Sequence, residues 1–282
     1  WLPILVMTFS RSQTGRLLRQ MVYRSRADMP TSTVDEIDSD HIANLKSKIK
    51  RGKKRLFSKL TRKTDYESLL SRHSKQVDLL LRSLWKRQLA ATNSTLIAVG
   101  GYGRGSLFPF SDIDLLILTP DTVSKSDEKL IVSFVSTLWD IGLDVGHSVR
   151  KINECIDEAK KDITTQTTLM ESRFLCGSKS LFKNFEFVMK SKINVRDFCN
   201  AKLVELRQRH SRYNDSSQNL EPNLKESPGG LRDLQTILWI TQAAGFGSTW
   251  TEISENSVIT KAEKSQLEKH ERALIFVRTL LH

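Results

Sequence analysis

The chain has 282 residues, of which 39% are hydrophobic and 27% are charged, and its formal net charge is +12. This balance is typical of a globular protein with room for one large domain or two ordinary ones, and no apolar run reaches the roughly 20 residues of a membrane-spanning helix. The three cysteines form no CxxC pair. They argue against a disulfide framework or a cysteine-based zinc site and favour a reduced protein of the cytoplasm.

The positive charge is confined to the N-terminal third. Residues 1–95 contain 20 Lys and Arg against 8 Asp and Glu, whereas residues 96–282 contain 24 of each kind. The excess centres on Lys46–Lys63, which can attract a polyanion such as nucleic acid, although a solvated basic helix face is the simpler interpretation. Because Phe57 is the only aromatic residue of this stretch, base stacking has little to work with. We expect no specific nucleic-acid partner and no membrane partner.

The chain divides into four segments by pattern. Residues 1–40 show no sustained periodicity, and we expect a poorly ordered lead-in. Residues 41–92 are basic and helical, with apolar side chains at three- and four-residue spacing on one stripe. Residues 93–192 alternate strands and helices, which predicts a compact core, and residues 193–282 predict a mainly helical domain. Since the chain lacks an initiator methionine and stops within the apolar pattern "ERALIFVRTLLH", we expect a truncated helical domain and a fragment of a longer protein.

The expected elements follow from apolar periodicity and from glycine and capping signals. The predicted strands cover residues 95–99, 112–119 and 143–150. The predicted helices cover residues 124–142, 152–161, 167–177, 181–191, 195–214 and 231–245, with a last helix from about residue 260.

Two acids interrupt the apolar run of the second predicted strand. Asp112 and Asp114 are two residues apart, so their side chains point to the same face, while Ile113 and Leu115 point into the core. Carboxylates this close repel each other unless a cation lies between them, and hard oxygen ligands suit Mg²⁺, with Mn²⁺ as a further possibility. Alone, a D-x-D pair is a weak signal, because surface strands also carry such pairs.

A glycine turn precedes these acids. Gly100 and Gly101 end the first predicted strand, and free backbone N–H groups after them can cradle a phosphate, although a plain tight turn has the same sequence. Ten residues separate Gly101 from Asp112, enough for a short helix and a return to the neighbouring strand. Arg104 belongs to this turn and either reaches phosphate or faces solvent. The spacing therefore predicts a phosphate cradle beside a metal-binding pair.

A third acid follows on the next predicted strand. Asp144 lies between the apolar Leu143 and Val145. If this strand pairs beside the D-x-D strand, Asp144 completes a three-carboxylate cluster that can hold two metal ions about 4 Å apart. The alternative is a surface acid on an edge strand.

A second glycine pair lies in the stretch "LKESPGGLRDLQ". Gly229 and Gly230 stand just before a predicted apolar helix, with Lys225 and Arg232 on either side. This arrangement predicts either an anion site at the helix start or an interdomain turn with a capping Arg–Asp pair. The sequence favours neither.

Four stretches together resemble a known family. They are "VGGYGRGSLFPFSDIDLLIL", "LWDIGLDVGHSVR", "ESRFLCGSKSLF" and "NLEPNLKESPGGLRDLQTILWI", in this order. A G-G turn, about ten residues, D-x-D on a strand and a later acid between apolar residues is the signature of the polymerase-β-like nucleotidyltransferases. The longer strings closely resemble the N-terminal region of the bifunctional uridylyltransferase/uridylyl-removing enzymes that modify the nitrogen-signalling protein PII.

This resemblance implies a polymerase-β-like nucleotidyltransferase core over residues 93–192, built as a small mixed sheet with helices, and a mainly helical domain after it. It implies transfer of UMP from UTP to a tyrosine hydroxyl of PII, with Mg²⁺ in a two-metal site. It assigns metal binding and catalysis to Asp112, Asp114 and Asp144. It assigns nucleotide binding to Gly100, Gly101, Arg104, Ser111, Lys225 and Arg232.

Two other functions stay open. A related nucleotidyltransferase could use another nucleotide or acceptor, as a protein adenylyltransferase does. A non-catalytic module could dock its basic segment on nucleic acid, although such a module has no reason to keep three charges in apolar strands. The full-length family continues into a phosphohydrolase domain with a His-Asp motif and into glutamine-sensing domains. Since the chain contains no His-Asp dipeptide, we expect no uridylyl-removing activity from it.

Overall fold

The structure is a computed structural model and describes residues 39–58, 60, 65–213 and 223–281. The lead-in expected over residues 1–40 lies outside the described residues, apart from its last two. No helix in the described part of the chain is long and apolar enough to cross a lipid bilayer.

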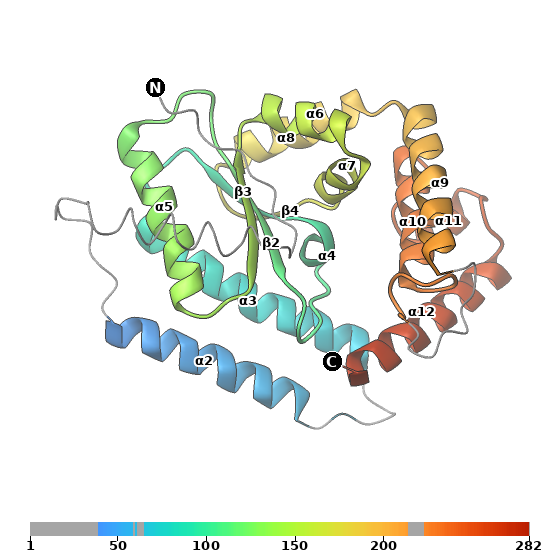
Figure 1. The fold of residues 1–282 in the computed structure, drawn as a ribbon, viewed down its shortest axis with the longest axis horizontal. Coiled ribbons are helices and arrows are strands. Elements are labelled where there is room, and N and C mark those ends of the chain that lie inside the picture. The colour runs from blue at the N-terminus through green and yellow to red at the C-terminus, as the bar shows by residue number, and fades with distance from the viewer. Residues whose placement is uncertain (1–38, 59, 61–64, 214–222, 282) are drawn as a thin grey trace.

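A four-stranded mixed sheet lies at the centre of residues 65–192, which we call the first domain (Figure 1). Its strands are β1 (Thr95–Ala98), β2 (Ile113–Leu118), β3 (Val145–Arg150) and β4 (Arg173–Gly177), in the spatial order β3-β2-β1-β4. Strand β1 pairs antiparallel with β2 and β4, whereas β2 and β3 run parallel. The mixed sheet among helices confirms the predicted α+β fold class.

Helices cover both faces of this sheet: α3 (Tyr66–Gln88) and α5 (Lys125–Asp140) on one, α6 (Ile152–Lys161), α7 (Ile163–Met170) and α8 (Lys179–Lys192) on the other. Ile113 and Leu115 of β2 are buried in the first core, as expected from their alternation with the acids. Leu116 and Leu118 are buried in the second core. Burial on both faces explains why β2 continues as an unbroken apolar run after its acid.

The basic segment expected to be helical over residues 41–92 forms two helices, α2 (Ser39–Phe57) and α3. Asp65 caps the start of α3, because its side chain accepts a hydrogen bond from the Ser68 N–H (3.1 Å). The apolar stripe predicted for α3 is confirmed by its burial. The buried members are Leu69, Leu70, Val77, Leu81, Leu84 and Trp85.

The prediction of one helix over residues 167–177 is wrong in its second half. Helix α7 covers only the first part, and Arg173–Gly177 forms the edge strand β4. The helical spacing of apolar residues is coincidental here, since pairing with β1 satisfies the backbone groups and buries Leu175 (2% exposed). The strand ends at Gly177 (φ +101°), where a Cβ atom would lie 2.4 Å from the Ser94 carbonyl oxygen.

The described residues from 193 onward, which we call the second domain, lie beside the short helix α4 (Gly100–Gly103), which follows β1 (Figure 1). Its helices are α9 (Val195–Arg212), α10 (Leu231–Ala243), α11 (Trp250–Glu255) and α12 (Lys261–Leu281). Helix α12 runs back to the first domain, where the rings of Phe276 and Tyr66 lie 5.0 Å apart. Part of the apolar face of α12 is thereby covered by α3.

The three cysteines are free thiols. Burial raises the pKa of both Cys155 and Cys176 to about 12, so these thiols stay protonated at neutral pH. The free thiols agree with the sequence-based argument against a disulfide framework.

Candidate active site

A cavity of about 450 Å³ lies between the glycine turn of the first domain and helices α9, α10 and α12 of the second. The two domains therefore contribute opposite walls. The cavity brings together every site residue predicted from the sequence except Asp144: Gly100, Gly101, Arg104, Ser111, Asp112, Asp114, Lys225 and Arg232.

The glycine turn is fixed by two different constraints. Gly100 adopts φ +56°, in the left-handed region that favours glycine. Gly103 has no room for a side chain, because a Cβ atom would lie 1.7 Å from the Glu171 carbonyl oxygen. Gly101 has room, since a Cβ atom there would meet only the Arg104 guanidinium at 3.6 Å. The sequence pattern therefore located the turn, while the tightest position is one that the prediction did not single out.

A buried network of hydrogen bonds and an ion pair connects this turn to helix α3 and strand β4. The hydroxyl of Tyr102, which is 1% exposed, donates a hydrogen bond to Asp78 of α3 (2.5 Å). Arg173 of β4 forms an ion pair with Asp78 (2.6 Å) and also donates to the carbonyl oxygens of Tyr102 and Gly103. Burial and the charge of Asp78 raise the pKa of the Tyr102 hydroxyl, which therefore stays a donor. The turn is thus tied to both a helix and a strand.

The paired acids lie together in the wall formed by the first domain. Burial raises the pKa of Asp114 to about 6, and the charge of Asp112 adds to the rise. The Asp114 carboxylate lies between two glycines: a Cβ atom on Gly146 would be 2.8 Å from one oxygen, and one on Gly100 would be 3.3 Å from the other. Two carboxylates with mutual repulsion and hard oxygen donors fit a divalent cation.

Replacing Gly146 with alanine is expected to displace the Asp114 carboxylate, because the new methyl group would meet an oxygen atom of that side chain. We expect about tenfold weaker binding of Mg²⁺ or Mn²⁺, as for other changes to the support of a metal ligand. A metal titration of the two proteins measures this, with Ser148→Ala on the same strand as the control. Titration curves that coincide for Gly146→Ala and the wild type would refute the close approach.

Asp144 does not line the cavity. It stands just before β3, its side chain is exposed, and its carbonyl oxygen accepts the Ile113 N–H (2.8 Å). The parallel ladder pairs Ile113 of β2 with Val145 of β3. Asp144 therefore lies one residue before the pairing partner of Ile113, at the end of β3 that is next to the D-x-D pair. Among the described residues, no three His, Cys, Asp or Glu side chains are grouped closely enough to hold a metal ion. The three-carboxylate cluster therefore stays a prediction.

The opposite wall carries positive charges that the sequence prediction missed. Lys202 of α9 is buried (1% exposed), with its ammonium group paired to Glu205 (2.5 Å) and 4.3 Å from the centre of the Trp239 ring. Burial lowers the pKa of Lys202 and of Lys225. A spacing of three and four residues puts Lys202, Glu205, Arg209 and Arg212 on one face of α9, and this polar stripe is the signal that could have revealed them.

Glu171 links the two walls. Its side chain is 7% exposed, forms an ion pair with Arg104 (2.5 Å) and accepts a hydrogen bond from the Trp239 indole of α10 (2.5 Å). Arg104 therefore lines the cavity and is paired at the same time, so neither of its two expected roles describes it fully. Glu171 is the first residue of "ESRFLCGSKSLF", one of the stretches that resemble the family. No local sequence pattern indicated that it connects the two walls.

The turn of the second glycine pair is held by an acidic side chain of α10, and the two cations that flank the glycines line the cavity. Asp233 accepts a hydrogen bond from the Gly229 N–H (2.7 Å) and pairs with Arg209 (2.7 Å), which makes a capping arrangement. Lys225 and Arg232 line the cavity, and Arg232 pairs with Glu226 (3.1 Å). The turn therefore presents cations to the cavity, whereas an anion site at the start of α10 stays a prediction.

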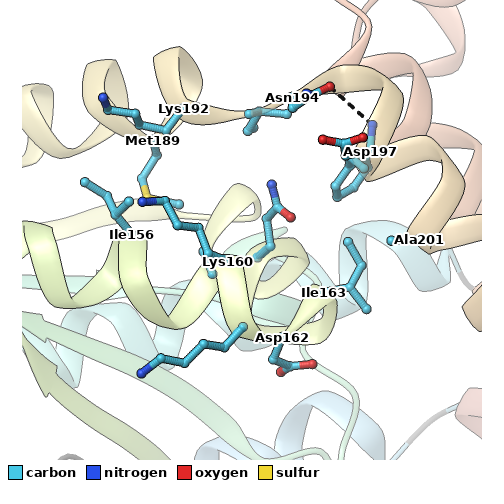
Figure 2. Close-up of a pocket in the computed structure, with 14 residues that line it drawn as sticks. Ile156, Lys160, Asp162, Ile163, Met189, Lys192, Asn194, Asp197 and Ala201 are labelled. Atoms are coloured by element: carbon cyan, nitrogen blue, oxygen red, sulfur yellow. Dashed lines mark hydrogen bonds between the residues drawn. The ribbon is translucent and has the colours of Figure 1, made fainter.

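Another cavity, of about 480 Å³, lies where α6 and α7 meet the junction of α8 and α9 (Figure 2). One of its acids, Asp162, accepts hydrogen bonds from the N–H groups that start α7. Asn194 caps α9 by accepting a hydrogen bond from the Asp197 N–H (3.2 Å), the dashed line in Figure 2. Lysines and apolar side chains make up most of the remaining lining. The first cavity is therefore the better candidate for catalysis.

Comparison with known proteins agrees with this choice. Residues 74–169 match the family model described as a nucleotidyltransferase domain, a class that generally uses divalent metal ions. The chain therefore carries a nucleotidyltransferase domain, and its D-x-D pair and glycine turn lie inside the matched region. The match begins within α3, earlier than the predicted boundary at residue 93, and the predicted domain boundaries stay predictions.

A second family model gives a more specific match. Residues 197–282 match the family model described as GlnD PII-uridylyltransferase. The chain is 44% identical over 234 residues (83% of this chain, 27% of the relative) to a bifunctional uridylyltransferase/uridylyl-removing enzyme of Ralstonia nicotianae. It is 50% identical over 216 residues (77% and 25%) to that of Bordetella avium and 43% identical over 237 residues (84% and 28%) to that of Burkholderia thailandensis. The chain belongs to this family and spans about a quarter of the length of these relatives.

Proposed function

We propose that this region catalyses metal-dependent transfer of UMP from UTP to a tyrosine hydroxyl of the PII signalling protein, with release of pyrophosphate, in the cytoplasm. The observation that carries the proposal is the cavity itself, which has the Asp112–Asp114 pair on one wall and a group of cations on the other. Paired carboxylates suit metal binding, and the cations suit a triphosphate. The 43–50% identity to bifunctional uridylyltransferase/uridylyl-removing enzymes supports the choice of nucleotide and acceptor.

The residues divide into metal ligands and phosphate-binding residues. Asp112 and Asp114, with Asp144 as a third ligand, would hold Mg²⁺ or Mn²⁺. When bound, the metal would supply a lower pKa for the attacking hydroxyl and neutralisation of the charge on the departing pyrophosphate. The glycine turn and the cavity cations would bind the phosphate groups, through Gly100, Gly101, Arg104, Ser111, Lys225 and Arg232.

The reaction is an in-line displacement at phosphorus. The tyrosine oxygen forms a bond to the α-phosphorus of UTP, and the bond from that phosphorus to the oxygen bridging to the β-phosphorus breaks. The hydroxyl proton passes to a base, a role that we assign to Asp144. The cations of the second wall bind the negative charge of the pyrophosphate as it leaves.

A transfer assay tests this function directly. The protein is incubated with Mg²⁺, purified PII and each nucleoside triphosphate labelled in the α-phosphate. We expect label on PII from UTP, none without a divalent metal, and none on an acceptor whose target tyrosine is changed to phenylalanine. Label from ATP alone would establish adenylyl transfer instead, and label transfer without metal would contradict the proposed role of the paired acids.

A further inference from the structure

Helix α12 brings an arginine into the catalytic cavity from the far end of the described chain. Arg278 lines the cavity together with Arg104, Lys225 and Arg232. Its guanidinium carbon lies 4.1 Å from the centre of the Phe108 ring, in the connection between α4 and β2. Nothing in the sequence near Arg278 marks it as a site residue.

The partners of Arg278 differ from those of its neighbours. Arg104 is paired with Glu171, and Arg232 is paired with Glu226. The guanidinium of Arg278 forms neither a hydrogen bond nor an ion pair with any residue that the structure describes, and it lies over the Phe108 ring. A partly buried cation without an anionic partner is costly, especially among other cations.

The charges around this side chain point the same way. Burial lowers the pKa of Arg278 to about 10, and the positive charges of Arg104 and Arg232 add to the effect, against a weaker opposing influence of Glu226. The cavity therefore has a positive field at this point in the absence of substrate. Such a field is relieved by a multiply charged anion, and a guanidinium fork matches phosphate oxygens in a bidentate way.

We propose that Arg278 binds the phosphate groups of the nucleoside triphosphate, so that α12 supplies part of the substrate site. The Phe108 ring beneath the guanidinium fixes the plane of the fork before substrate arrives. Leu274 and Ile275, one turn earlier in α12, pack in a cluster with Phe108. This packing holds the helix in position next to the cavity. The inference rests on the proposed nucleotidyl transfer and adds a phosphate-positioning residue to it.

The test uses inorganic tripolyphosphate with Mg²⁺ as the probe, so that neither the base nor the acceptor affects the result. Calorimetry compares the wild type, Arg278→Gln, Arg278→Lys and the matched control Arg272→Gln, an exposed arginine of the same helix. We expect about tenfold weaker binding for Arg278→Gln, an intermediate loss for Arg278→Lys and no change for the control. Thermal unfolding without ligand should show an equal or higher midpoint for Arg278→Gln, because a like charge leaves the cluster.

Each outcome bears on the inference. Equal tripolyphosphate binding by Arg278→Gln and the wild type would overturn it, as would a wild type that does not bind the probe. If the unfolding midpoint falls for Arg278→Gln and not for Arg272→Gln, Arg278 has a structural role. This result would also overturn the inference. If the expected binding losses appear but the protein does not uridylylate PII, the phosphate contact stands and the proposed acceptor or nucleotide is wrong.

Discussion

Asp114→Asn is expected to lower nucleotidyl transfer by about a thousandfold or more and, without metal, to make the protein more stable near pH 8. The loss of activity follows because the amide cannot replace a charged oxygen ligand, and a thousandfold corresponds to about 4 kcal/mol of transition-state stabilisation. The same carboxylate destabilises the metal-free fold, since burial and Asp112 raise its pKa from 3.8 to about 6.

The pH dependence of this stability has a definite sign. Because the folded pKa lies above the unfolded value, the protonated form contributes its full stability below about pH 4, and this contribution is lost as the pH rises through 6. At pH 8 the ionised carboxylate therefore costs about 1–3 kcal/mol, which asparagine does not. With a chelator present, the free energy of unfolding of Asp114→Asn should exceed that of the wild type at pH 8. The difference between the two proteins should disappear near pH 4.

The control for this experiment is Asp121→Asn, an exposed acid in the loop after β2. It should change neither the activity nor the pH dependence. Full turnover by Asp114→Asn would contradict the metal assignment. A variant less stable than the wild type at both pH values would instead indicate a structural role for this acid.

Gly103→Ala is expected to destabilise the protein by about 3 kcal/mol or more. The new Cβ atom would lie 1.7 Å from the Glu171 carbonyl oxygen and 3.0 Å from that of Ala98. All of these neighbours are backbone atoms, so no side chain can rotate away. The turn or strand β4 would have to move, and the ion pair between Arg173 and Asp78 would move with them.

Gly101→Ala provides the matched control, because its Cβ atom would meet only the Arg104 guanidinium at 3.6 Å. Urea unfolding should place it within about 1 kcal/mol of the wild type. If the backbone at Gly101 approaches the triphosphate, this variant should still bind Mg²⁺–UTP more weakly. Unfolding midpoints that coincide for Gly103→Ala and the wild type would show that the turn is less constrained than described.

Local features of the site could be predicted from the sequence, because they depend on short spacings. Alternation along one strand sets Asp112 and Asp114 on the same face, with Ile113 buried on the other. The glycine pair before them ends β1, as predicted, and its turn lines the same cavity. In each case the deciding residues lie within a few positions of one another.

Features that depend on tertiary contacts could not be predicted in this way. Glu171 and Arg278 reach the cavity from segments far from the D-x-D strand, and only folding brings them to it. Strand β4 was missed because its helical spacing looked regular, whereas its pairing with β1 is a long-range property. Gly103 looked like an ordinary turn residue, since its constraint comes from the backbone of Glu171.

The central claim is that metal and nucleotide bind in the cavity between Asp112–Asp114 and the cations of the second domain. Crystals grown with Mn²⁺ and a non-hydrolysable UTP analogue test it most directly, because anomalous scattering locates the metal without ambiguity. We expect Mn²⁺ on the carboxylates of Asp112 and Asp114, with the triphosphate between this metal and Arg232. Manganese away from these carboxylates, or nucleotide in the other cavity between α6 and α9, would contradict the account.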